Sequence, residues 1–368
     1  MRLPNIGGDR SNINEPEATR IVRYAIDHGV NYLDSGYSYN GGNSEFFMGR
    51  VLKDGYRDKV RIATKLPIRL VESAQDFDRY LNEQLEKLQT NIDFYLFHGL
   101  SRRSWRRMQE FGLLKWAEEK MTQGKFGHLG FSFHDDFDAF KEIVDGYDNW
   151  TLTQIQYNYM DINFQAGQRG LEYAADKGLA VVVMEPLRGG RLTMELPAHI
   201  KEIWQAARNK RTPADWAFSW VYNQPGVAVA LSGMNTMEQV VENLEIADMT
   251  SVNMLTDDDI NTIAKVRTAF NNLSPVPCTG CAYCLPCPNG VDIPRIFSLY
   301  NDALIYNNPQ QGQARYRNQD FIPKEQRADH CLECGECIIA CPQNIDIPDV
   351  LKKAHDILKF FDESRRTR

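Results

Sequence analysis

Short apolar runs alternate with longer amphipathic segments along the first three quarters of the chain. Runs rich in β-branched residues predict buried strands, and intervening segments with apolar residues every three or four positions predict helices. The predicted strands cover residues 30–34, 60–65, 92–98, 128–133, 152–156, 179–184 and 227–231. The predicted helices cover residues 15–28, 75–88, 104–122, 167–177, 213–223 and 237–247.

This alternation of strand and helix predicts an α/β fold with a parallel (β/α)8 TIM-type barrel. An open doubly wound sheet is the second candidate, but no Gly-x-Gly-x-x-Gly motif follows any predicted strand. A closed barrel of this type has eight strands. The first predicted helix begins about fourteen residues from Met1. We therefore expect the first strand to be missing, with unpaired edges at residues 30–34 and 227–231 and weaker cofactor binding than in a chain extended upstream.

All eight cysteines lie beyond residue 277, and the Pro- and Asn-containing segment 271–277 has the composition of a linker. We therefore expect a barrel domain over residues 1–273 and a cysteine-rich domain over residues 274–368. Hydrophobic residues make up 43% of the chain and charged residues 25%, which is typical of globular proteins.

The charge and hydropathy patterns exclude several classes of function. The net charge is −7, and Lys and Arg are scattered among Asp and Glu, so we expect no nucleic-acid binding. The longest apolar run, residues 179–184, has six residues, whereas a membrane span needs about 20. No secretory signal is recognisable at the start of the sequence, so we expect a reducing cytoplasmic location without disulfides.

The cysteines form two similar runs. The candidate metal ligands are Cys278, Cys281, Cys284 and Cys287, followed by Cys331, Cys334, Cys337 and Cys341. Each run is followed by a related segment, residues 291–294 after the first and 345–348 after the second. Three cysteines at this spacing with a further Cys-Pro are typical of ferredoxins that bind two [4Fe–4S] clusters. The alternative is two structural zinc sites, although zinc ligands usually come as separated pairs.

The segment between the runs is long for a compact ferredoxin, and residues 295–307 predict a helix. The region resembles the helical ferredoxin domains of respiratory and related redox enzymes. In two-cluster ferredoxins the fourth cysteine of each run binds the other cluster. The resemblance therefore implies one cluster on Cys278, Cys281, Cys284 and Cys341, and another on Cys331, Cys334, Cys337 and Cys287. The first run departs from the usual pattern because two residues, not three, precede Cys287.

Ionisable residues end three consecutive predicted strands: Asp34, Lys65 and His98. Barrel enzymes place their reactive groups at this end of the strands, so the three side chains are expected at one mouth. Taken singly, Asp34 also fits a helix cap, Lys65 a solvated residue and His98 a core imidazole.

With Tyr39 added, this pattern resembles the aldo/keto reductases over nearly all of residues 1–272. The family's catalytic tetrad matches Asp34, Tyr39, Lys65 and His98, in the correct order and spacing. The resemblance implies that Tyr39 is the general acid and Lys65 the cation that favours its phenolate. It also implies that Asp34 holds Lys65, and that His98 orients the substrate carbonyl.

The same resemblance implies a site for NADP or NAD. The matching cofactor-binding positions are Ser132, Gln154, Met184, Pro186, Leu187, Arg188, Gly189, Ser232, Gly233, Met234, Gln239 and Asn243. This chain departs from the family at several of them: Phe133 replaces a common Asn, Met184 a stacking aromatic ring, and Gly233 and Gln239 the basic residues that commonly grip the 2′-phosphate.

The resemblances together imply an oxidoreductase that transfers hydride between NAD(P)H and a small carbonyl or alcohol substrate, coupled to iron–sulfur electron transfer. A hydride carries two electrons and a cluster one, so direct exchange needs an intermediary such as a flavin or a radical-stabilising substrate. The iron–sulfur clusters also imply a one-electron redox partner, a ferredoxin or flavoprotein. The alternative is a ferredoxin-like electron-transfer subunit whose barrel docks a partner or senses a nucleotide.

Overall fold

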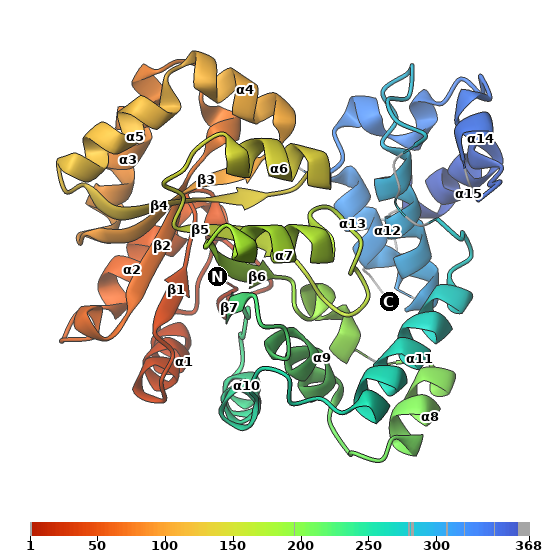
Figure 1. Cartoon of the computed structure of the whole chain (residues 1–368), viewed down its shortest axis with the longest axis horizontal. Helices are drawn as coiled ribbons and strands as arrows, with labels where there is room; N and C mark the ends of the chain where they lie inside the picture. Colours follow the sequence, from red (N-terminus) through yellow and green to blue (C-terminus); the bar gives the residue numbers. More distant parts are fainter. Residues whose placement is uncertain are drawn as a thin grey trace. The chain divides into compact units, whose positions relative to one another are not determined.

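The computed structural model describes residues 2–194, 196–278, 280, 283–306, 308–319, 321–341 and 343–359. The chain divides into two compact units, which Figure 1 colours along the sequence. The first unit comprises Met1–Leu192 and Arg211–Leu255, and the second comprises Thr193–Lys210 and Thr256–Arg368. Two segments upstream of residue 274 thus belong to the second unit, and the boundary near residue 274 stays a prediction.

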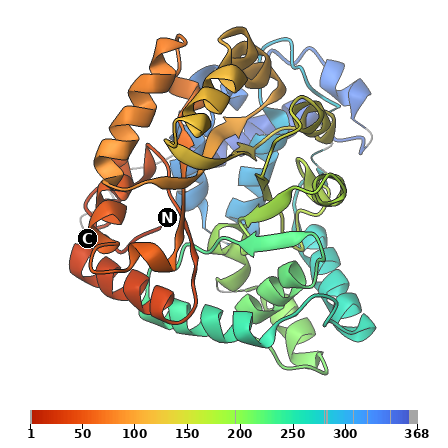
Figure 2. The same ribbon diagram turned by 60° about the vertical axis from the view of Figure 1, so that its left-hand side comes forward.

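Seven parallel strands form the sheet of the first unit. They are β1 (Tyr32–Asp34), β2 (Arg61–Leu66), β3 (Ile92–Leu100), β4 (Phe126–Phe133), β5 (Leu152–Gln156), β6 (Ala180–Met184) and β7 (Val227–Ala230). Each strand pairs with the next in sequence order, and the sheet curves into a nearly closed barrel (Figures 1 and 2). The predicted fold class and all seven predicted strands are confirmed. No strand of this sheet lies within residues 2–31 of the description.

Residues 2–14 fold back on themselves before the first helix. Asn5 and Ile13 form an isolated antiparallel bridge, and the Asn14 amide donates to the Pro4 carbonyl at 2.9 Å. Side chains of the loop that follows β1 hold the second half of this segment. Asn40 Nδ2 donates to the Arg10 carbonyl at 3.1 Å, and Asn43 Nδ2 donates to the Ser11 carbonyl at 2.9 Å. The segment therefore lies at the carboxyl-terminal end of β1.

Five predicted helices of the first unit are confirmed: α1 (Glu15–Asp27), α3 (Gln75–Leu88), α7 (Gly167–Asp176), α9 (Pro213–Tyr222) and α10 (Met237–Met249). Polar side chains start three of them, because the side chains of Asn14, Thr212 and Thr236 each accept a hydrogen bond from a backbone amide of the first turn. Helices α2 (Ser44–Val51) and α6 (Phe137–Asp145) were not predicted.

The prediction of one helix over residues 104–122 is wrong. The chain forms α4 (Arg102–Glu110) and α5 (Leu113–Thr122) instead. Gly112 has a φ of 74°, in the left-handed region that a continuous right-handed helix cannot contain. The amphipathic period continues across this residue, which is why the pattern alone predicted one helix.

A layer of apolar side chains fills the barrel beneath the strand ends. Ala63, Leu96, Leu152 and Val182 are buried in it, and Tyr32, Phe94 and Val229 pack against them. These residues come from β1, β2, β3, β5, β6 and β7, so side chains fill the barrel interior. This apolar layer forms the floor of the barrel mouth, where the carboxyl-terminal ends of the strands lie.

The second unit is helical. It contains α8 (Ala198–Ala206), α11 (Asp257–Leu273), α12 (Ile293–Ile305), α13 (Pro309–Arg317), α14 (Glu336–Ala340) and α15 (Ile347–Lys359). Helices α12, α13 and α15 pack on one another around an apolar core that includes Ile296, Phe297 and Leu351. Helix α12 confirms the predicted helix in this region.

The sequence repeat is also a structural repeat. Helix α12 begins at Ile293 after Asp292, and α15 begins at Ile347 after Asp346. The aspartate that precedes each helix accepts a hydrogen bond from the backbone amide three residues on. The distance is 3.3 Å for Asp292 and 3.4 Å for Asp346. Each cysteine run is therefore followed by a helix with the same kind of start. Among the residues that the structure describes, no helix is both long and apolar enough to cross a bilayer.

Candidate active site and cluster site

A buried ion pair joins the ends of β1 and β2. The Lys65 ammonium donates to both Asp34 carboxylate oxygens at 2.7 Å and to the Ser35 carbonyl at 2.6 Å. Lys65 is fully buried, and the Asp34 side chain is 12% exposed. Burying an ammonium is costly unless its charge and its donors are matched, and these three oxygens satisfy both requirements. The lysine is thus fixed in one position as a cation.

Tyr39 and His98 lie beside this ion pair. The Lys65 ammonium is 4.9 Å from the centre of the Tyr39 ring, and the His98 ring meets the Tyr39 ring edge-on at 5.7 Å. The loop around Tyr39 tolerates little change, because a Cβ at Gly36 would lie 3.1 Å from the Tyr39 ring. Asn40, Gly41 and Gly42 then follow with positive φ angles, which turn the chain from Tyr39 into α2. The structure therefore brings all four predicted tetrad residues together.

The charges of this cluster act on one another. Burial lowers the pKa of Lys65, but the charges and hydrogen bonds of Asp34 and Tyr39 together outweigh burial and hold the Lys65 pKa above its ordinary value. Burial raises the pKa of Tyr39, while Lys65 opposes that rise through its charge and a hydrogen bond. Burial and then the Lys65 charge lower the pKa of His98 to about 3. At neutral pH the site therefore holds an ammonium, a protonated phenol and a neutral imidazole.

Ser132 and Gln154 lie on neighbouring strands above the same floor. Gln154 Nε2 donates to the Asp34 carboxylate at 2.6 Å, and Gln154 Oε1 is buried without a hydrogen-bond partner among the described residues. Ser132 Oγ accepts from the Gly99 amide at 2.7 Å, which leaves its own hydroxyl proton available to donate. An unused buried acceptor and a hydroxyl donor thus remain beside the tetrad.

The last residue of β6 and the loop after it contain five predicted cofactor contacts, and their environments differ. The backbone of Arg188 and Gly189 has positive φ, at 50° and 69°. The Arg188 guanidinium is ion-paired with Asp161 at 3.3 Å, so part of its donor capacity is used within the protein. Leu187 packs against the apolar cluster of Ala214, Phe218 and Ile246. Met184 is the last residue of β6, and Pro186 lies in the loop between Met184 and Leu187.

The remaining predicted contacts follow β7. Asn243 Nδ2 donates to Ser232 Oγ at 3.1 Å, and Gln239 Oε1 accepts from the Asn235 amide at 3.0 Å. Met234 packs against the apolar cluster of α1 and α10, and a Cβ at Gly233 would lie 2.8 Å from the Arg2 side chain. Ser232, Gly233 and Met234 lie in the short loop that leads into α10, and Gln239 and Asn243 lie in the first turns of that helix.

Two features near the site were not predicted from the sequence. Arg2 lies between the loops after β6 and β7, since its Nη1 donates to the Gly189 carbonyl at 3.0 Å. Glu45 of α2 is fully buried and accepts from the Thr64 hydroxyl, next to Lys65, at 2.5 Å. Burial raises the pKa of Glu45. Glu45 lies in the first turn of the short helix α2 that follows Tyr39, and this position was the sequence feature that could have identified it. No local feature of the sequence identifies Arg2.

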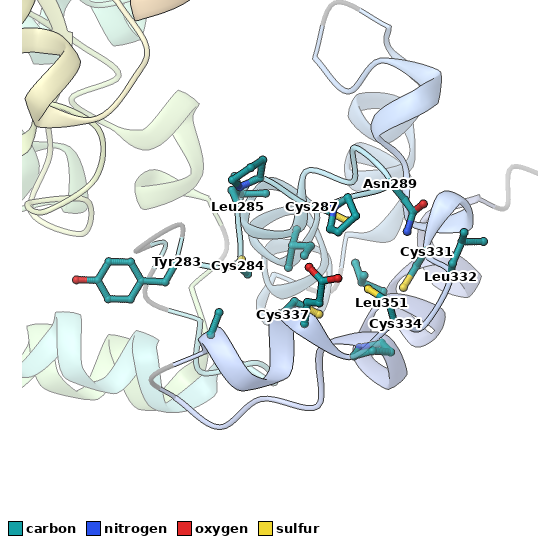
Figure 3. A pocket seen from close by; sticks show the side chains of 16 residues that line it. Tyr283, Cys284, Leu285, Cys287, Asn289, Cys331, Leu332, Cys334, Cys337 and Leu351 are labelled. Carbon is teal, nitrogen blue, oxygen red and sulfur yellow. The ribbon is translucent and has the colours of Figure 1, made fainter.

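In the second unit, cysteines from both runs line one cavity of about 120 Å³. Figure 3 shows Cys284 and Cys287 of the first run together with Cys331, Cys334 and Cys337 of the second among the residues that line this cavity. Burial raises the pKa of Cys337, and the nearby thiols of Cys331, Cys334 and Cys287 add to the rise. Cys278 and Cys341 pack at the edge of the same apolar core, and Cys281 lies outside the described residues.

The spacing of these thiols bears on what they could hold. Within the described parts of the chain, no three Cys, His, Asp or Glu side chains are close enough to bind a single metal ion. A single zinc ion needs its sulfurs about 2.3 Å from one point. A cubane carries each thiolate on a separate iron, so its ligands stand around a cage. Five thiols around one cavity fit the second arrangement better.

Comparison with known proteins identifies the family. The model of the aldo/keto reductase family matches residues 4–268, and a model described as a 4Fe-4S dicluster domain matches residues 277–345. The chain therefore belongs to the aldo/keto reductase family of oxidoreductases and carries a 4Fe-4S dicluster domain. The resemblance to the aldo/keto reductases and the prediction of a 4Fe-4S ferredoxin-type domain are confirmed.

Individual relatives are distant. A 6-dehydroglucose reductase of Novosphingobium aromaticivorans is 26% identical over 252 residues, or 62% of this chain and 80% of that protein. An NADH-specific methylglyoxal reductase of Escherichia coli is 25% identical over 264 residues, or 59% of this chain and 78% of that protein. The structure of an aldo-keto reductase from Klebsiella pneumoniae in complex with NADPH gives a TM-score of 0.56 at 22% identity, covering 72% of this chain and 88% of that one. That likeness shows the fold.

Proposed function

We propose that this chain interconverts a small carbonyl compound and its alcohol with NADP or NAD, and that two [4Fe–4S] clusters in its second unit carry single electrons. The observation that carries the first half is the position of Lys65. Its ammonium is fixed by Asp34 and Ser35 and lies 4.9 Å from the Tyr39 ring. A phenol next to a fixed cation is suited to donate a proton.

The groups around the tetrad suit a nicotinamide carboxamide. The unused acceptor of Gln154 can take an amide proton, and the Ser132 hydroxyl can donate to an amide oxygen. A nicotinamide cofactor supplies the hydride when bound. The methylglyoxal reductase of Escherichia coli is NADH-specific by name and the Klebsiella pneumoniae structure contains NADPH, so both dinucleotides are candidates for this chain.

The chain's own residues then handle the proton. Tyr39 donates its hydroxyl proton to the carbonyl oxygen as the alcohol forms. Lys65 stabilises the phenolate that is left, and Asp34 keeps Lys65 in place. His98 is neutral, so it can offer one ring N–H to the carbonyl oxygen without competing as an acid. The apolar layer below the site excludes water from the floor.

The cysteines suit two clusters with crossed ligation. Cys284 and Cys287 line the same cavity as Cys331, Cys334 and Cys337, so thiols of both runs lie close together. Crossed ligation would place one cluster on Cys287, Cys331, Cys334 and Cys337. The other would use Cys278, Cys281, Cys284 and Cys341. Such thiolates persist in a reducing compartment, in keeping with a cytoplasmic location. A ferredoxin or flavoprotein partner would link one-electron transfer to the hydride chemistry.

The test is turnover of anaerobically purified protein with NADPH and with NADH against a panel of aldehydes, ketones and alcohols. Substrate-dependent oxidation or reduction of the nicotinamide supports the enzyme. Nucleotide binding without turnover on any substrate would favour the alternative, an electron-transfer subunit whose barrel senses a nucleotide or docks a partner. Iron and sulfide analysis of the same preparation tests the clusters: about eight of each per chain are expected, and zinc without sulfide would exclude them.

A further inference from the structure

We propose that Arg2 binds phosphate oxygens of the dinucleotide, supplying from the first residues of the chain a positive charge that the loop after β7 lacks. The inference rests on the proposed function, because it assigns a residue to the same cofactor site. Arg2 lies where the loops after β6 and β7 meet. Its Nη1 donates to the Gly189 carbonyl at 3.0 Å, and its side chain passes over Gly233.

Gly233 makes room for this arginine. A Cβ built at Gly233 would lie 2.8 Å from Arg2 Cδ, 2.9 Å from Cγ and 3.0 Å from Cβ. The Arg2 stem therefore occupies the space into which a side chain at position 233 would project. The glycine and the arginine are complementary, and a larger residue at 233 would displace the guanidinium.

The surrounding charges leave a place for an anion. Residues 231–236 contain no Lys or Arg, and the guanidinium of Arg188 in the facing loop is ion-paired with Asp161. The Arg2 side chain is exposed and spends one donor on Gly189, so several guanidinium N–H groups remain for a ligand. Arginine binds phosphate through two parallel hydrogen bonds, which are among the stronger hydrogen bonds in proteins. A phosphate over this loop would also face the amino-terminal end of α10.

The experiment measures dissociation constants by fluorescence titration, without turnover, for NADPH, NADH, 2′,5′-ADP and ADP. We expect Arg2→Ala to raise the dissociation constant for NADPH by roughly 10-fold or more, as for loss of a charged hydrogen bond. Arg2→Lys should retain part of the affinity, since lysine keeps the positive charge but cannot form the two parallel hydrogen bonds of a guanidinium. A loss confined to NADPH and 2′,5′-ADP would place the contact on the 2′-phosphate. An equal loss for NADH and ADP would place it on the pyrophosphate.

The matched control is Arg10→Ala, an exposed arginine of the same segment whose backbone carbonyl, not its side chain, is held by Asn40. It should leave all four constants unchanged. Gly233→Ala should weaken binding in the wild-type background by displacing Arg2, but have little further effect in Arg2→Ala. If Gly233→Ala only loosened the loop, it would weaken binding equally in the wild type and in Arg2→Ala. A smaller effect in Arg2→Ala therefore shows that the substitution acts through Arg2.

Unchanged or tighter NADPH binding by Arg2→Ala would overturn the inference while leaving the proposed function intact. A wild-type protein that binds none of the four nucleotides would overturn the proposed function, and the role of Arg2 with it.

Discussion

Tyr39 is the residue on which the proposed chemistry depends most directly. Tyr39→Phe removes the proton donor but leaves the ring that meets His98. We expect carbonyl reduction to fall by about 10² to 10⁴, the range for loss of general acid catalysis. The dissociation constant of the nucleotide should change little. Both are measured on the same preparation, by steady-state kinetics and by titration.

Tyr37→Phe is the matched control for this prediction. It removes a phenol hydroxyl from the same loop, but that hydroxyl donates to Glu83 of α3 at 2.7 Å. The Tyr37 variant should keep most of its activity. Full turnover by the Tyr39 variant would show that another group donates the proton.

His98 gives a prediction about pH and stability. Its pKa in the folded protein is about 3, against an ordinary value of 6.5. Between these values the unfolded chain binds more protons than the folded one, so stability falls as pH drops below about 6.5. The slope from this group is at most about 1.4 kcal/mol per pH unit. Urea unfolding from pH 7.5 to 5.5 should show a smaller loss for His98→Gln than for the wild type, and equal losses would contradict a neutral, buried His98.

At the residue scale, Asp34, Lys65 and His98 were predicted to lie together because each ends a strand whose period is clear. Parallel strands bring such residues together wherever the barrel closes. Tyr39 was added by the resemblance to the aldo/keto reductases. Arg2 and Glu45 could not be predicted in the same way. The contact of Arg2 with Gly189 spans 187 positions, and the burial of Glu45 depends on α3, which supplies Gln84 beside it.

At the scale of elements, the two cysteine runs predict an exchange of ligands. Cys287→Ser should disturb the cluster of the second run, although Cys287 belongs to the first, because it lines the cavity with Cys331, Cys334 and Cys337. Cys341→Ser should disturb the other cluster. Electron paramagnetic resonance of each variant after reduction would show which cluster signal is altered. Loss of the same signal in both variants would contradict the crossed arrangement.

The elements themselves were predicted best where the period was long and uninterrupted. All seven strands and most barrel helices follow from it, whereas α2, α6 and α8 are only eight or nine residues long and give a weak signal. The break between α4 and α5 depends on the backbone of Gly112, which a hydrophobic period does not reveal. In the cysteine-rich region, the repeated Asp-Ile-Pro segments were recognisable, but not that both would start helices.

At the scale of the whole molecule, the sequence separated a barrel from a cysteine-rich domain. It did not reveal that residues 193–210 and 256–273 pack within the second unit. The interactions of α11 with α8 join segments about 60 positions apart, and no local pattern specifies such a partner. The aldo/keto reductase match extends to residue 268, whereas the first unit ends at Leu255.

The two kinds of cofactor make a last prediction about the whole molecule. A nicotinamide releases two electrons together as hydride, and a cubane accepts one, so direct transfer between them is not expected. Anaerobic protein mixed with NADPH or NADH should therefore keep the visible absorption of its oxidised clusters, while dithionite should bleach it. Adding free FMN in catalytic amount should allow NAD(P)H to reduce the clusters, since a flavin accepts two electrons and passes them on singly. Bleaching by NAD(P)H alone at the rate of turnover would instead show that the protein contains its own intermediary.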